Sequence, residues 1–209
     1  MDQPNHLSLF RKAYFLIFLA ILSYFFLDRP LQTSPSPFFK PLYKVLTLAI
    51  FPPLHLALWG SFFLIARIKK NVWTLPLFEI AFAQGLGAIF VRIAKFLIGR
   101  ARPELYLKKG IFGLYGLQWD NHFHSFPSGH ALTAFTLATS LSFLLPKWRT
   151  PFLLLALAFS LSRVLLAKHY LSDVLGGAAC GIIISTLTHT LLKHPKVTPL
   201  CDRFLLPQP

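Results

Sequence analysis

Six apolar runs alternate with short polar segments along the chain, and each has the composition of a helix inside a membrane. The runs occupy residues 13–27, 45–66, 73–98, 131–145, 151–167 and 171–192. A helix needs about 20 apolar residues to cross about 30 Å of hydrocarbon. Several runs are shorter, so we expect flanking Lys and Arg side chains to reach for the interface. The pattern predicts an all-α, polytopic membrane protein, a bundle of six transmembrane helices.

The runs group into one membrane domain, residues 1–192, followed by a tail, 193–209, whose proline and mixed charge predict poor order. Residues 13–27 follow Arg11 and Lys12 in the manner of a signal peptide. No small-residue cleavage site comes after them, so we expect a retained first helix.

The amino-acid composition indicates which class of molecule the protein binds. The chain is 55% hydrophobic and only 13% charged, yet its net charge is +14. The basic residues sit in short clusters between apolar runs, which argues against a nucleic-acid-binding face and favours anionic membrane lipid. No obligate protein partner is implied. Two cysteines indicate no disulfide framework.

Basic clusters also predict the orientation. The clusters at 11–12, 67–70 and 147–149 fall on one side if six helices alternate, and that side is expected to be cytoplasmic. The loops 28–44 and 99–130 then lie on the opposite side. We expect a bacterial inner membrane protein whose polar motifs face away from the cytoplasm.

Three polar motifs interrupt the apolar pattern near the ends of runs on that side. The first is Lys95-x6-Arg102-Pro103, the second is Pro127-Ser128-Gly129-His130, and the third is Ser162-Arg163-x5-His169-x3-Asp173. If the segment from His169 is helical, His169 and Asp173 share one face, so the carboxylate can fix the imidazole tautomer. A charged side chain inside a membrane is energetically costly, so it is interpreted by default as a functional residue.

The residue types in these motifs suit a phosphate group. Lys95, Arg102 and Arg163 supply positive charge, and Ser128 adds a hydroxyl donor. Gly129 opens the next apolar run, where backbone N–H groups at a helix start can point at an anion. Together the motifs predict an anion site.

The order, spacing and residue types of the three motifs resemble the signature of the type 2 phosphatidic acid phosphatase superfamily, which includes the vanadium haloperoxidases. The resemblance implies that His169 attacks phosphorus to form a phosphohistidine, that Asp173 orients it and that His130 protonates the leaving group. Lys95, Arg102, Ser128, Gly129 and Arg163 would bind the phosphate. No metal and no other cofactor is expected, because three cations supply the positive charge.

The implied function is a membrane phosphatase acting on a lipid phosphate monoester or lipid pyrophosphate. Phosphatidic acid, phosphatidylglycerophosphate, undecaprenyl pyrophosphate and lipid A phosphate all stay open as substrates. Two alternatives remain: a catalytically inactive protein that binds or transports lipid phosphates, and a vanadium haloperoxidase, although the known ones are soluble.

Four further features carry expectations. Pro52-Pro53 should kink the second run. Gly177-x3-Gly181 should let another helix approach the last one closely. Arg100 is either an outer phosphate contact or an interface anchor. The aromatic loop 104–124 is expected to lie over the headgroup region and govern selectivity.

Overall fold

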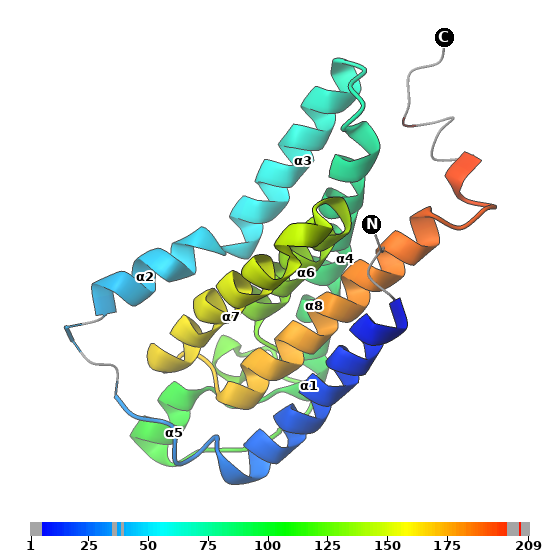
Figure 1. Ribbon diagram of the computed structural model, residues 1–209. Coiled ribbons are helices and arrows are strands. Elements are labelled where there is room, and N and C mark those ends of the chain that lie inside the picture. The colour runs from blue at the N-terminus through cyan, green and yellow to red at the C-terminus, as the bar shows by residue number, and fades with distance from the viewer. Residues whose placement is uncertain (1–5, 35–36, 39, 200–204, 206–209) are drawn as a thin grey trace.

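The computed structural model describes residues 6–34, 37–38, 40–199 and 205. All the regular secondary structure elements within these residues are helices. The helices are α1 (His6–Phe26), α2 (Lys40–Ala49), α3 (Pro52–Ile68), α4 (Thr74–Ile98), α5 (Pro103–Lys109), α6 (Gly129–Leu144), α7 (Arg149–Leu165) and α8 (Leu171–Leu192). Two 3₁₀ turns, η1 (Asn121–Phe123) and η2 (Pro146–Trp148), precede α6 and α7. Figure 1 shows them as one elongated bundle. The all-α expectation is confirmed.

Five helical stretches within the described residues are long and apolar enough to cross a membrane: 6–26, 40–68, 74–98, 146–165 and 171–192. Their outward faces carry large apolar side chains, such as Phe15 and Phe25 on α1. These stretches identify an integral membrane protein. The sixth expected span is α6, whose 16 residues are too few for this length criterion. Six spans therefore remain a prediction.

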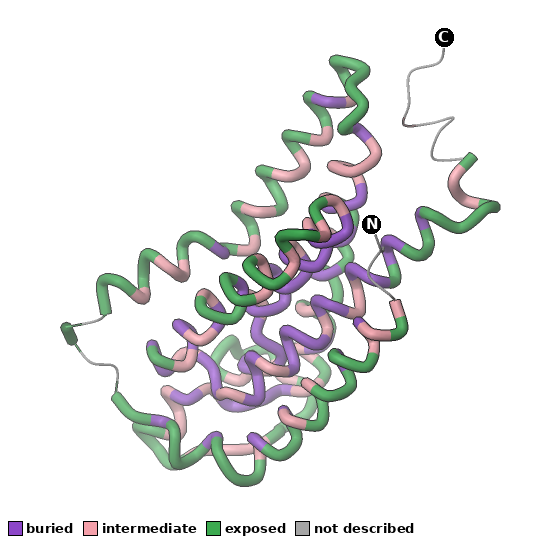
Figure 2. Tube along the Cα trace, in the orientation of Figure 1, coloured by how far each residue is buried: buried purple, intermediate pink, exposed green. Residues whose placement is uncertain are grey.

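Helix α6 forms the centre of the bundle and is buried on nearly every side (Figure 2). It packs closely on α8, where Gly177 and Gly181 of the last run permit the approach. A Cβ atom on Gly177 would lie 2.5 Å from the carbonyl oxygen of Ser128, and one on Gly181 would lie 2.6 Å from that of Leu132. The expected close helix contact is confirmed, because only glycine leaves room for the α6 backbone.

The second apolar run is broken where expected. Helix α2 ends at Ala49 and α3 begins at Pro52, since proline lacks the N–H that would continue the helix. The two segments run at an angle to one another in Figure 1, and α2 lies against α7. This break brings the basic start of α2 to the same end of the bundle as α5. Of the predicted tail, only 193–199 and 205 are described, so its order stays a prediction.

The end of α4 directs the following residues into the protein interior. Gly99 adopts a left-handed conformation, with φ of 56°, and its N–H bonds the carbonyl of Lys95. A Cβ there would lie only 1.8 Å from the carbonyl oxygen of Gly116, so glycine is required. The chain therefore turns at once, and Arg100 enters the core.

Candidate active site

A cavity of about 380 Å³ lies at the end of the bundle where the three polar motifs meet. The predicted basic and imidazole residues in its lining come from five separate parts of the chain: Lys95 on α4, Arg102 before α5, His130 on α6, Arg163 on α7 and His169 before α8. Arg92 and His124 also line it. Apolar residues such as Phe51 and Val91 complete the wall. The predicted convergence of the motifs is what the structure shows, although the roles of the residues remain a prediction.

His169 lines this cavity and is in contact with Asp173 in the first turn of α8. His169 is 3% exposed, and its Nδ1 lies 3.4 Å from Asp173 Oδ2. This distance exceeds the usual N–H···O range of about 2.7–3.2 Å, so the contact is looser than a full hydrogen bond. Helix α8 begins only at Leu171, so His169 precedes the helix and the two residues do not meet through the helical spacing considered from the sequence. The contact forms because Asp173 caps the helix start and faces back towards His169.

Asp173 is held by more donors than sequence indicated. Its Oδ2 accepts hydrogen bonds from Ser125 Oγ at 2.5 Å and from the backbone N–H of Tyr170 at 2.9 Å. Its own carbonyl accepts a bond from the backbone N–H of Ser128 at 3.0 Å. Asp173 therefore ties the start of α6 to the start of α8, and it leaves the Nε2 side of His169 as the side available to the cavity.

Two of the cavity's cations are oriented by backbone carbonyls of one loop. Lys95 Nζ donates to the carbonyl of His124 at 2.5 Å, and Arg102 Nε donates to the carbonyl of Asn121 at 2.9 Å. The loop expected to cover the site thus borders the cavity through its last residues, Asn121 and His124. Its influence on selectivity stays a prediction.

The start of α6 contributes His130 and the first-turn N–H groups. Ser128 is fully buried, its Oγ accepts a bond from the N–H of Ala131, and it is not part of the cavity lining. Gly129 lines the cavity, where a Cβ would meet only Val91 at an ordinary 3.7 Å. The N–H groups of Gly129 and His130 have no intrahelical acceptor by position, so they are suited to an anion.

Burial controls the charge of these groups. It lowers the pKa of His169 to about 3, although the contact with the Asp173 carboxylate acts in the opposite direction. His169 is therefore neutral near pH 7 and can use a ring nitrogen as a nucleophile. Burial also lowers the pKa of Arg102, against the carboxylates of Asp173 and Glu104, but an arginine stays charged at neutral pH.

Arg100 has a place that neither sequence interpretation gave it. It is 1% exposed and lies between two carboxylates that are 0% exposed, Asp28 and Asp173. Arg100 Nη2 contacts Asp28 Oδ2 at 2.5 Å, while Nη1 donates to Asp173 Oδ1. Arg100 is therefore neither an interface anchor nor part of the cavity wall. It holds the Asp173 carboxylate in place without itself lining the cavity.

Asp28 was missed by sequence analysis, and it completes this buried network. Its Oδ1 accepts bonds from Ser23 Oγ and from the N–H of Ser172, both at 3.0 Å. The one signal available was scarcity, since an acidic residue directly after an apolar run is unusual in a chain with seven acidic residues. Through Asp28, the end of α1 is fastened to the start of α8.

Comparison with known proteins gives three relatives that bear the name lipid A 1-phosphatase. That of Rhizobium johnstonii is 34% identical over 107 residues, 51% of this chain and 44% of the relative. That of Rhizobium etli is 35% identical over 100 residues, 48% of this chain and 43% of the relative. That of Porphyromonas gingivalis is 32% identical over 124 residues, 57% of this chain and 24% of the relative. Each match spans less than half of the relative's length.

A family model covers the region that builds the site. The model of the PAP2 superfamily matches residues 76–195, which contain all three motifs and helices α6, α7 and α8 entire. This region is more than half of the chain, and it includes every predicted site residue from Lys95 to Asp173. With its motifs gathered around one cavity in a helical membrane bundle, the chain belongs to the PAP2 superfamily.

Proposed function

We propose that this protein is a membrane phosphatase that hydrolyses a lipid phosphate monoester or lipid pyrophosphate through a phosphohistidine on His169. The observation that carries the proposal is the cavity that is lined by Lys95, Arg102 and Arg163 together with the imidazoles of His130 and His169. A transferring phosphoryl group spreads negative charge over three equatorial oxygens. Three cations and the α6 N–H groups match that distribution, so the mechanism needs no metal.

The reaction divides into two steps. In the first, His169 Nε2 attacks phosphorus, the bond from phosphorus to the leaving oxygen breaks, and His130 gives that oxygen its proton. In the second, water attacks the phosphohistidine, passes its proton to His130, and inorganic phosphate leaves with His169 restored. His130 suits both steps by its position, because it lines the same cavity as His169 and its Nε2 has no hydrogen-bond partner among the described residues. Asp173 holds His169 in the attacking orientation.

The substrate proposed first is a lipid A 1-phosphate, the substrate class in the names of the three relatives. The other lipid phosphates left open by the sequence are the comparison set. The site lies at one end of a membrane bundle, so a headgroup can enter while acyl chains stay in lipid. We further propose six spans, with α6 as the sixth, in a bacterial inner membrane with the site on the extracytoplasmic face.

The test is release of inorganic phosphate by purified full-length protein from a panel of these lipids in detergent, with EDTA present. We expect turnover that resists the chelator and disappears in the His169→Ala variant. A rapid quench that avoids acid should trap labelled phosphate on the wild-type protein only. Activity that is lost to EDTA and restored by Mg²⁺ would refute the metal-free mechanism, and label on the His169→Ala variant would refute the intermediate.

Orientation has its own test. A single cysteine at Lys108 should react with an impermeant thiol reagent in intact cells, while one at Lys69 should not. A reversed labelling pattern would place the site in the cytoplasm.

A further inference from the structure

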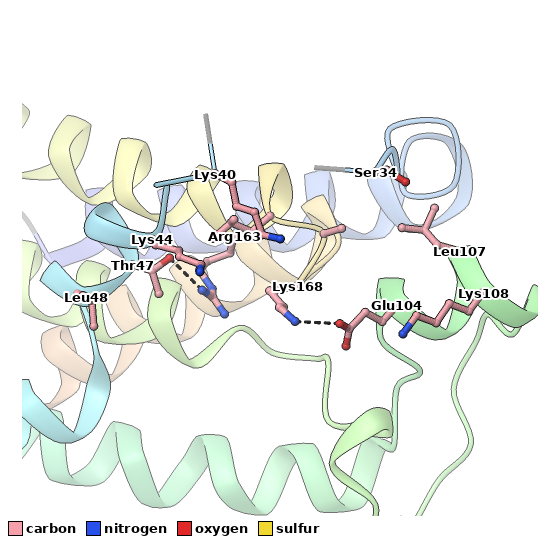
Figure 3. A pocket seen from close by; sticks show the side chains of 12 residues that line it. Ser34, Lys40, Lys44, Thr47, Leu48, Glu104, Leu107, Lys108, Arg163 and Lys168 are labelled. Carbon is pink, nitrogen blue, oxygen red and sulfur yellow. Dashed lines mark hydrogen bonds and ion pairs between the residues drawn. The ribbon is translucent and has the colours of Figure 1, made fainter. Parts of the chain in front are cut away.

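A second and larger cavity, of about 610 Å³, shares the Arg163 side chain with the candidate active site. Figure 3 shows the residues that line it. Figure 3 shows Lys40 and Lys44 from α2 on one side and Glu104 with Lys108 from α5 on the other. Nothing in the proposed chemistry at His169 uses this space. We call it the basic vestibule, and its charged lining is Lys40, Lys44, Glu104, Lys108, Arg163 and Lys168.

The basic vestibule carries an excess of positive charge. Its lining holds five basic side chains and one acidic one. Glu104 forms an ion pair with Lys168, in which Lys168 Nζ lies 2.9 Å from Glu104 Oε1. Among the described residues, no ion pair neutralises Lys40 or Lys44, and both are exposed. Like charges gathered in a concave space repel one another and attract an anion.

Arg163 joins the vestibule to the active site, because its side chain lines both cavities. One Nη atom is fixed by a hydrogen bond to Thr47 Oγ1 at 2.9 Å, while Nε is buried and has no hydrogen-bond partner among the described residues. A guanidinium offers five donors in one plane and can contact anions from two directions. Two anions, one in each cavity, would therefore lie on opposite sides of Arg163.

We propose that the basic vestibule binds a second phosphate of the same substrate headgroup while the first is cleaved at His169. This inference rests on the proposed function and names its preferred substrate class, lipids whose headgroup carries two phosphoryl groups. The space exceeds what one phosphate needs, so it also accommodates the headgroup atoms that link the two. Lysine ammonium groups on flexible stems suit an anion whose position varies with that linker.

The test compares two synthetic lipids with identical acyl chains and an identical scissile phosphate. One carries a second phosphate on the headgroup, and the other carries a hydroxyl in its place. In the Lys40→Gln/Lys44→Gln double variant, kcat/KM for the bisphosphorylated lipid should fall roughly tenfold or more, mainly through KM, because each 1.4 kcal/mol of lost binding is a factor of ten. For the monophosphorylated lipid it should change less than about threefold. A matched Lys69→Gln/Lys70→Gln variant, in the loop between α3 and α4, should leave both values unchanged.

Equal losses on the two lipids, or no loss on either, would overturn the proposal. A second result would also overturn it. In that result, added inorganic phosphate or anionic lipid changes the turnover of the monophosphorylated lipid by the wild-type protein and not by the double variant. The vestibule would then bind a separate anion. Failure of the proposed function looks different: wild-type protein would release no phosphate from either lipid. Equilibrium binding of the two lipids then still decides the inference, which requires that only the bisphosphorylated lipid binds more weakly to the double variant.

Discussion

The most informative perturbation is the replacement of Arg100 by methionine, which keeps a long side chain and removes the charge. Burial acts to lower the pKa of Arg100, but the carboxylates of Asp173 and Asp28 outweigh it and the pKa is raised. Its guanidinium is thus charged and paired on both sides. The variant leaves two carboxylates, each 0% exposed, with no cation between them.

The expected cost follows from that geometry. Breaking a buried ion pair by removing one partner costs about 3–5 kcal/mol, since the remaining charge is buried and uncompensated. For a chain of this size each kcal/mol lowers Tm by about 2–4 °C, so Tm should fall by roughly 6–20 °C. The reorientation of Asp173 should also lower kcat by roughly a hundredfold, with KM little changed, because Arg100 does not line the cavity.

Thermal unfolding and steady-state phosphate release, both in the same detergent, measure the two effects. Asp28→Asn keeps the contact between Arg100 and Asp173, so its loss should be smaller, about 1.5–3 kcal/mol. Arg11→Met, at an exposed arginine of α1, is the matched control and should be silent. A Tm within 2 °C of wild type together with a raised KM for Arg100→Met would show that Arg100 binds substrate, and would refute the positioning role.

Three other predictions test the site and the packing that holds it. His130→Ala should slow turnover of a lipid phosphate by about 10²–10⁴-fold and have a far smaller effect on an aryl phosphate, whose leaving group needs no proton. His169→Ala should abolish turnover of both substrates, and equal losses on the two for His130→Ala would make His130 a phosphate ligand. Gly177→Ala should destabilise the protein by about 1–3 kcal/mol in thermal unfolding, because its Cβ meets the Ser128 carbonyl at 2.5 Å, while Gly85→Ala, whose nearest neighbour is 3.9 Å away, should not. Because burial lowers the pKa of His169 to about 3, its ring ¹⁵N shifts should stay those of a neutral imidazole from pH 5 to 8, and titration in that interval would contradict the buried environment.

The sequence by itself predicted the long helices and the three motifs that meet at the cavity, while α5 lies in a segment that was expected to be a loop. Apolar runs predicted where the long helices lie, because a chain in lipid must satisfy its backbone polar groups within each segment. Helix α1 is the exception at its start, since it begins at His6 rather than at residue 13. Pro52-Pro53 marked the break between α2 and α3, and the glycines at 177 and 181 marked the face that receives α6. Polar groups are costly in such runs, so the motif residues stood out from Lys95 to Asp173.

The tertiary structure alone decided how these residues are supported. Asp28 and Ser172 are 144 positions apart, and Arg100 and Asp173 are 73 apart, so no local pattern relates them. The same holds for the basic vestibule, where α2, α5 and the end of α7 meet only after the bundle forms. Local periodicity fixes which face of a helix is apolar. Which buried charge meets which partner depends on the packing of α1, α4 and α8 against one another, and that packing is set by the shape of the whole bundle.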